Sequence, residues 1–187
     1  MTLFGDQIFT KRLVLRRIQE EDLANLARWS NSQEAHGPYL SPDKQSLQHF
    51  RDQHTAGSLW CDHSKYFIIQ HKNGAPLGTI HYWLRNETNS IGVMAIKIAC
   101  PEERRKGFGT EAQKFLIMFL FQRLRLDAVD MYTDINNVAQ QRCLQKLGFE
   151  VLDSLSYADH KVHRQGFLYR LHRKSFFEHP IYQHHYE

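Results

Sequence analysis

The residues best suited to chemistry lie between positions 101 and 112, where three consecutive cations precede two glycines spaced by one residue. The cations, Arg104 to Lys106, carry full charges that match phosphate oxygens. Gly107 and Gly109 let the backbone turn tightly and bring its N–H groups close to a ligand. The apolar segment that follows predicts a helix, whose first N–H groups and positive dipole end point back at this loop. The stretch therefore predicts a strand–loop–helix cradle for phosphate groups.

Two other interpretations of this stretch compete with a phosphate cradle. Residues Gly107 to Ala112 also fit the dinucleotide fingerprint G-x-G-x-x-A, and Asp127 lies about twenty residues further on, as that fingerprint requires. In the fingerprint, however, the glycines follow the strand directly, whereas here the charged spacer Pro101 to Lys106 intervenes. The spacer favours a ligand with more phosphate charge than NAD. The other alternative is a solvated basic loop without a ligand.

A second motif, Asn137 to Phe149, favours the functional interpretation, because its pattern is N-x-A followed by L-x-K-x-G-F. The two stretches together resemble the GCN5-related N-acetyltransferase (GNAT) superfamily, whose acetyl-CoA motif [Q/R]-x-x-G-x-[G/A] is matched by Arg104 to Gly109. The segment Arg12 to Arg16 and the region of Trp29 look most like the RimJ/RimL branch, which acetylates ribosomal proteins at their N-termini. The resemblance implies direct acetyl transfer from acetyl-CoA to a primary amine, either a protein N-terminal α-amine or a small amine.

The resemblance also implies a role for each matching residue. The backbone of the strand that precedes the loop should bind the pantetheine arm, the loop amides should hold the pyrophosphate, and Arg104 and Lys106 should add charge. The amine attacks the thioester directly, so Cys100 and Cys143 need not be nucleophiles, and no metal is implied. The residues so assigned to acetyl-CoA are Ile96, Ile98, Arg104, Arg105, Lys106, Gly107, Phe108, Gly109, Thr110, Asn137 and Arg142.

The groups that move protons are harder to assign, because this chain departs from the family pattern. The strand from Ser90 to Ile98 has no carboxylate where many GNATs carry a Glu base, and Leu144 stands where many have a Tyr acid. His81 is a candidate base, since imidazole titrates near neutral pH, with packing as the alternative. Asp134 is a candidate for orienting the amine, with helix N-capping as the alternative. Tyr39 and Tyr132 are candidates for lining the acceptor site. A non-catalytic acyl-CoA sensor is the second functional hypothesis.

Composition sets broad limits on the class of protein. The chain has 187 residues, of which 42% are hydrophobic and 24% charged, as in a soluble globular domain. A net charge of +4 suits acidic small ligands but does not indicate nucleic acid. Three cysteines without CxxC spacing and twelve histidines without metal-site spacing indicate neither disulfides nor zinc. No apolar run is long enough for a membrane span and no signal peptide is evident, so we expect a cytoplasmic protein. We also expect a monomer or a homodimer.

The pattern of apolar residues predicts an α/β (α+β) fold in one domain, 1–187, with an irregular tail from about residue 175. Together with the resemblance, it predicts a mixed, twisted, mostly antiparallel sheet with helices on both faces. A central parallel pair of strands near Ile98 and Tyr132 should splay apart. Strands are expected at 12–18, 65–71, 78–84, 90–98, 128–133, 149–152 and 166–171, a turn at 86–89, and helices from Glu20, from Ser41 as N-cap, at 109–123 and at 137–147.

Overall fold

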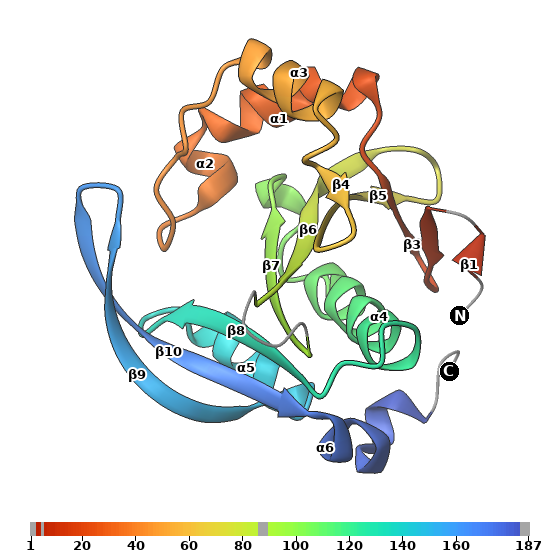
Figure 1. Cartoon of the computed structure of the whole chain (residues 1–187). Coiled ribbons are helices and arrows are strands. Elements are labelled where there is room, and N and C mark those ends of the chain that lie inside the picture. The colour runs from red at the N-terminus through yellow and green to blue at the C-terminus, as the bar shows by residue number, and fades with distance from the viewer. Residues whose placement is uncertain (1–2, 5, 86–89, 184–187) are drawn as a thin grey trace.

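A single mixed sheet runs through the computed structural model, which describes residues 3–4, 6–85 and 90–183 (Figure 1). Its strand order is β1-β2-β3-β5-β6-β7-β8-β10-β9, and the short β4 pairs with β5. The strands are β1 (Leu3–Phe4), β2 (Gln7–Phe9), β3 (Leu13–Arg17), β4 (Trp60–Cys61), β5 (Ser64–His71), β6 (Pro76–Leu84), β7 (Ile91–Ile98), β8 (Ala128–Asp134), β9 (Glu150–Asp159) and β10 (Val162–His172).

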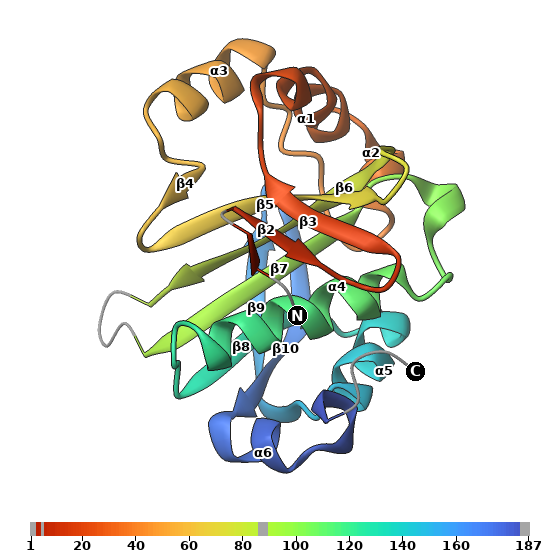
Figure 2. The ribbon, with the colours of Figure 1, turned by 90° about the vertical axis from the view of Figure 1, so that its right-hand side faces the viewer.

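Helices cover both faces of the sheet, as the sequence predicts. Helices α4, α5 and α6 pack on one face, and α1 and α3 form a second apolar cluster on the other, where α2 also lies (Figure 2). Their bounds are α1 (Leu23–Ser30), α2 (Gln33–His36), α3 (Leu47–Thr55), α4 (Phe108–Gln122), α5 (Val138–Lys146) and α6 (Arg173–Glu178), with 3-10 turns at Glu20–Asp22, Pro101–Glu103 and Pro180–Tyr182.

The feature that shapes the site is the short parallel ladder between β7 and β8. It consists of three pairs, the last of which joins Val93 to Asp130. All other strand pairs are antiparallel, and β7 stays paired with β6 as far as Ile98. Beyond Val93 the two parallel strands therefore separate. The predicted fold class, including the splayed central pair, is confirmed.

Asp130 anchors β8 to other strands at the point where β7 and β8 separate. Its side chain is fully buried and accepts hydrogen bonds from Nε and Nη2 of Arg170 at 2.6 and 2.8 Å. The Nη2 atom of Arg85 donates to the same carboxylate at 2.9 Å and to the Tyr132 hydroxyl at 2.8 Å. The hydrogen bonds to this carboxylate raise the pKa of Arg170, so its guanidinium stays charged. The ion pairs thus join β8 to β10 and to the end of β6.

The predicted start of the second helix at Ser41 is wrong. The helix α3 begins at Leu47, and its N-cap is Ser46, whose Oγ accepts a hydrogen bond from the N–H of His49 at 3.1 Å. Ser41 instead donates its backbone N–H to Asp159, on the distant β9 strand, at 2.8 Å. This tertiary contact, which local sequence does not encode, replaces the expected helix start. The short helix α2 was not expected from the sequence either.

The tail predicted to be irregular from residue 175 is ordered as far as Gln183, and that prediction is wrong. Helix α6 and the following turn bury Phe176 and Tyr182 in the main core. The Tyr182 hydroxyl donates to the Leu147 carbonyl at 2.6 Å. Aromatic packing rather than helical periodicity fixes this segment. The turn predicted at 86–89 lies outside the described residues.

Replacing Asp130 tests the role of its buried carboxylate at the point where β7 and β8 separate. Asp130→Asn keeps the shape but leaves two guanidinium groups facing each other without a counter-charge. We expect a loss of about 3 kcal/mol in the free energy of unfolding, measured by urea denaturation. Asp127→Asn, at an exposed position just before β8, is the control. Equal stability for the two variants would contradict the role given to Asp130.

Candidate active site

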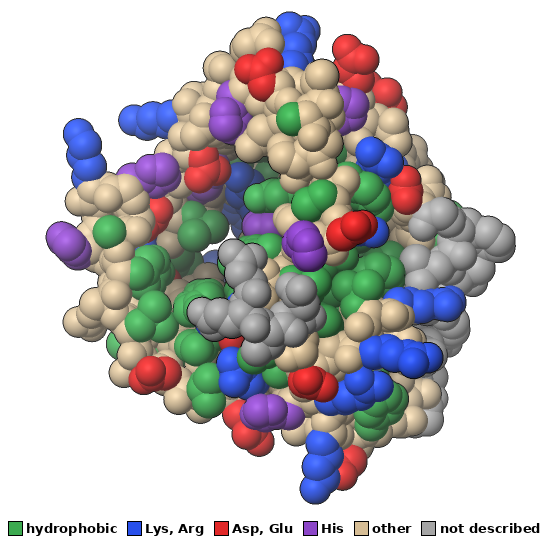
Figure 3. Space-filling model, viewed as in Figure 1, with side chains coloured by type: hydrophobic (Ala, Val, Ile, Leu, Met, Phe, Trp, Pro, Cys, Tyr) green, Lys and Arg blue, Asp and Glu red, His purple; other side chains and the backbone are tan. Residues whose placement is uncertain are grey.

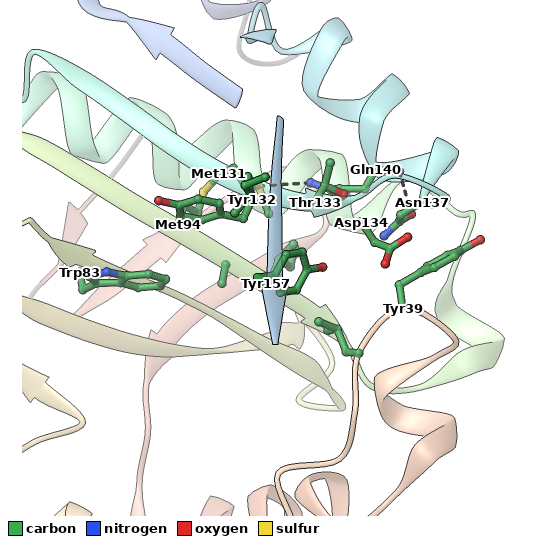
Figure 4. Close-up of a pocket in the computed structure, with 14 residues that line it drawn as sticks. Tyr39, Trp83, Met94, Met131, Tyr132, Thr133, Asp134, Asn137, Gln140 and Tyr157 are labelled. Carbon is green, nitrogen blue, oxygen red and sulfur yellow. Dashed lines mark hydrogen bonds between the residues drawn. The ribbon is translucent and has the colours of Figure 1, made fainter. Parts of the chain in front are cut away.

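The separation of β7 and β8 opens a cavity of about 510 Å³. Strand residues form two of its walls, and a loop before α3, a β6 tryptophan, the β9 strand and the start of α5 complete it (Figure 4). Figure 3 shows the surface hollowed beside the β9–β10 hairpin. The lining residues are Tyr39, Leu40, Trp83, Met94, Ala95, Ile96, Met131, Tyr132, Thr133, Asp134, Asn137, Gln140, Leu155 and Tyr157.

Strand β7 lines the cavity with Met94, Ala95 and Ile96, and its backbone beyond Val93 runs on to Ile98. This part of the backbone has ladder partners on β6 but none on β8 among the described residues. A strand edge of this kind presents N–H and C=O groups that need partners. An extended ligand with amide groups can therefore pair with β7 in the place that β8 vacates.

At the end of β7 the glycine loop leads into α4. Gly107 is the N-cap of this helix and has a φ of +83°, which favours glycine. The first helical hydrogen bond runs from the N–H of Glu111 to the carbonyl of Gly107, which leaves the preceding helical N–H groups for a ligand. A Cβ at Gly109 would lie 3.8 Å from Ile98 and 3.9 Å from Ile96, so the helix start adjoins the open edge of β7.

The turn between β2 and β3 fixes the position of this loop through one carboxylate, that of Glu111. Glu111 accepts hydrogen bonds from the hydroxyl of Thr10 at 2.6 Å and from Nε of Arg12 at 2.7 Å. Arg12 also donates to the Lys106 carbonyl at 2.9 Å and lies 4.4 Å from the centre of the Phe108 ring. Burial alone would raise the pKa of Glu111, but the hydrogen bonds from Thr10 and Arg12 lower it. The loop is therefore held by a charged carboxylate.

The three loop cations differ in what they contact. The guanidinium of Arg104 donates to the backbone carbonyls of Ile98 at 2.9 Å, Glu34 at 2.6 Å and Ala35 at 3.0 Å, so it braces α2 against the end of β7. Arg105 is exposed, and Lys106 is exposed while forming an ion pair with Glu103 at 3.1 Å. Arg142 is exposed on α5. The charge available at the loop surface comes mainly from Arg105 and Lys106.

Helix α5 brings the second motif to the same cavity. Asn137 is its N-cap, and its Oδ1 accepts from the N–H of Gln140 at 3.2 Å (Figure 4). Gln140 in turn donates to the buried Gln113 of α4 at 2.7 Å, which links the two helices. Cys143 lies 3.2 Å from the Thr110 hydroxyl, and burial raises the pKa of its thiol. A thiol with a raised pKa is a poor nucleophile, so Cys143 serves in packing.

The structure places His81 beside the cavity rather than in its lining. Its ring stacks between Tyr66, with centroids 4.0 Å apart, and Trp83, with centroids 5.0 Å apart. Burial, followed by the nearby charge of Lys97, lowers the pKa of His81 to about 4, although Asp43 opposes this shift. A neutral imidazole with so low a pKa is a weak base toward an alkylammonium group. The stacking contacts favour the packing alternative.

Asp134 lines the cavity and is buried, but both of its oxygens already have partners. Its Oδ1 accepts from the N–H of Asn136 at 2.8 Å, and its Oδ2 lies 3.7 Å from Nη1 of Arg164. The N-cap of α5 is Asn137, so the helix-capping alternative does not describe Asp134. Asp134 therefore combines a turn contact with an ion pair at the cavity wall.

Tyr39 and Tyr132 both line the cavity, whereas several other lining residues were not among the candidates from the sequence. Trp83 extends the aromatic wall, and Tyr157 reaches the cavity from β9. Thr133 is buried, and its hydroxyl has no hydrogen-bond partner in the described part of the chain. Period-two alternation marks these residues as strand residues, but it does not tell which ones meet across a tertiary gap.

Neither a metal-binding cluster nor a membrane-spanning helix is found in the described ranges. No group of three or more His, Cys, Asp or Glu side chains there could hold a metal ion. No helix in the same ranges has the length and hydrophobicity to cross a bilayer.

The splayed parallel pair, the glycine loop at a helix start and the motif on α5 define an acyltransferase of the GNAT class. The sequence profile of the acetyltransferase (GNAT) domain matches residues 12–150, and the chain belongs to this family. No curated protein matches the chain in a sequence comparison.

Solved structures share the fold at low sequence identity. Spermidine N-acetyltransferase from Vibrio cholerae, in complex with CoA and spermine, is 15% identical with a TM-score of 0.74, and the match covers 88% of this chain and 98% of that one. Ribosomal-protein-S5-alanine acetyltransferase from Vibrio fischeri is 16% identical with a TM-score of 0.76, and the match covers 91% and 98%. A GNAT-family acetyltransferase from Bacillus anthracis is 13% identical with a TM-score of 0.72, covering 90% and 99%.

The environment of His81 predicts an acid-sensitive fold. Because its folded pKa is about 4 and its unfolded pKa is near 6.5, the unfolded chain binds the proton first as the pH falls. Between pH 7 and pH 4.5 this histidine should therefore remove about 2–3 kcal/mol of stability, with no contribution above pH 7. His81→Phe should lose less stability over that interval than the wild type in urea denaturation. Parallel pH profiles for the two proteins would contradict the assignment.

The two loop glycines should differ in their tolerance of alanine. Gly107→Ala places a Cβ at positive φ, 3.3 Å from Nη2 of Arg12, and should cost about 1–2 kcal/mol. Gly109 lies inside α4, and a Cβ there meets only ordinary contacts with Ile96 and Ile98 of β7. Gly109→Ala should therefore be neutral or stabilising by up to about 1 kcal/mol. Thermal unfolding of the two variants checks this order, which the reverse ranking would refute.

Proposed function

We propose that the protein transfers the acetyl group of acetyl-CoA directly to a primary amine. The observation that carries this proposal is the unpaired edge of β7 next to the open helix start of α4. The edge of β7 suits the amides of a pantetheine arm, and the helix start of α4 suits a pyrophosphate. The two lie side by side, as a ligand with both groups requires.

The residues can be assigned to parts of acetyl-CoA on this basis. The backbone around Ile96 and Ile98 would pair with the pantetheine amides. The N–H groups from Arg105 to Thr110 would bind the pyrophosphate, with added charge from Lys106 and Arg142. Arg104 would keep the loop in place through its three carbonyl contacts rather than bind phosphate. Asn137 would contact the arm near the cavity.

The end of the cavity that is lined by the loop before α3, Trp83 and the β9 strand suits an amine acceptor. In the reaction, the nitrogen of a neutral amine forms a bond to the thioester carbon and the C–S bond breaks. The proton that this nitrogen loses passes, directly or through solvent, to the departing thiolate, which gives the amide and CoA with a free thiol. A protein α-amine, with a pKa of about 7.7–8.0, is partly neutral at pH 7 and needs little help from a base. Asp134 would attract the ammonium form before it loses its proton. The ribosomal-protein-S5-alanine acetyltransferase among the structural neighbours agrees with a RimJ/RimL-like protein acceptor, and the spermidine N-acetyltransferase agrees with a small amine.

A non-catalytic acyl-CoA sensor is the second candidate. The observation that favours it is the replacement of the family's acid and base positions, with Leu144 fully buried in the core. Such a protein would bind CoA in the same gap between β7 and β8, without turnover. The two candidates therefore share the donor site and differ only in chemistry.

A combined binding and turnover experiment separates them. Calorimetry should show CoA binding, and release of free thiol from acetyl-CoA should require an added amine. Replacing both Arg105 and Lys106 by Gln should weaken CoA binding about tenfold, which corresponds to 1.4 kcal/mol. The matched control replaces Arg123 and Lys174, exposed cations on other segments, by Gln. Binding without turnover on any amine would support the sensor, and absence of CoA binding would refute both candidates.

A further inference from the structure

The acceptor end of the cavity has few charges and many aromatic rings. Asp134 is the one charged side chain in its lining within the described residues, and no lysine or arginine lines it there. Tyr39, Trp83, Tyr132 and Tyr157 contribute rings, and leucines at 40 and 155 add aliphatic surface. Such walls favour contact with apolar groups, and aromatic rings also attract a single cation.

Arg164, from β10, controls the charge at this end. Its side chain is only 14% exposed, and its Nε donates to Asp159 at 2.7 Å. Its Nη1 lies 3.7 Å from Asp134, so one guanidinium faces two carboxylates. It also reaches the Pro38 carbonyl and the Ser41 hydroxyl, both at 3.5 Å, which ties the β9–β10 hairpin to the loop before α3.

Asp159 lies outside the cavity lining and is tied to neighbouring segments. Its Oδ2 accepts from Nε of Arg164 and from the backbone N–H of Ser41, the latter at 2.8 Å. Burial alone would raise the pKa of Asp159, but the hydrogen bonds from Arg164 and Ser41 lower it, so the carboxylate is charged. The next carboxylate, Asp43, contacts His36 at 3.3 Å and His160 at 3.7 Å. Asp134 is therefore the carboxylate that meets the cavity, and the guanidinium of Arg164 lies beside it.

We propose that the acceptor is an amine with one positive charge on an apolar body, and that Arg164 sets this preference by neutralising part of the acidic wall. This inference rests on the proposed acetyl transfer and narrows its acceptor class. One ammonium group matches the single carboxylate of the described lining, Asp134, and its apolar body would contact the rings of Tyr39, Trp83 and Tyr157. A polyamine would place further charges against apolar walls, where each lacks a partner.

The chemistry is shared by a small apolar amine and by a peptide N-terminus with apolar first residues, so the experiment includes both. Purified wild-type protein is assayed with acetyl-CoA and phenethylamine, the C-terminally amidated peptide Ala-Phe-Ala, or spermidine. We expect kcat/KM for phenethylamine or the peptide to exceed that for spermidine at least tenfold, and the better of the two identifies the source. Equal or better use of spermidine would overturn the inference. CoA binding without acetylation of any amine would overturn the proposed transfer itself.

A variant pair tests the role of Arg164 directly. Arg164→Gln removes the positive charge and should raise the ratio of spermidine to phenethylamine kcat/KM at least tenfold. Arg164→Lys retains the charge and should leave the ratio within about twofold of the wild type. Because the readout is a ratio, loss of active protein affects both substrates equally. A folded Gln variant with an unchanged ratio would refute the role of Arg164, and if that variant does not fold, the wild-type panel decides the acceptor class.

Discussion

The structure depends on one buried ion-pair group, the carboxylate of Asp130 between Arg85 and Arg170. A parallel strand pair normally continues until one strand ends, because each backbone group gains a partner. Here the pairing stops after Val93 and Asp130, and the charges at that point join β8 to β10 and to the end of β6 while β7 and β8 separate. The gap costs backbone hydrogen bonds in the free protein. A ligand with peptide-like groups can restore them, so the strand separation itself creates the donor site that we propose.

Much of the donor side could be predicted from the sequence, because it is encoded locally. Gly107 needs its positive φ, Asn137 caps α5, and the positions of both follow from motifs within a dozen residues. Arg104 shows the limit of this reasoning. Its type and position suggest a phosphate ligand, but its guanidinium contacts carbonyls on β7 and α2, a segment about seventy residues away. Charge is visible in a sequence, whereas the partner of a charge depends on tertiary packing.

The acceptor side could not be predicted in the same way, since segments distant in the chain build it. Ser41 was expected to cap a helix, yet its N–H meets Asp159 more than a hundred residues later. Arg164 carries no motif, and its importance appears only when the β9–β10 hairpin lies beside the loop before α3. From the sequence, His81 is a candidate base because imidazole ordinarily titrates near neutral pH, but its stacked, buried position lowers its pKa. Under the function that we propose, such contacts set substrate preference, so the family motifs bear on the donor and leave the acceptor open.

The central claim is that the gap between β7 and β8, with the helix start beside it, binds CoA. Backbone amide chemical shifts of isotope-labelled protein, followed during titration with CoA, test it most directly. The account predicts the largest shifts at Ile96 to Ile98 and at Arg105 to Thr110, with smaller changes on the outer strands β1 and β2. Shifts concentrated elsewhere, or no shifts at saturating CoA, would contradict it.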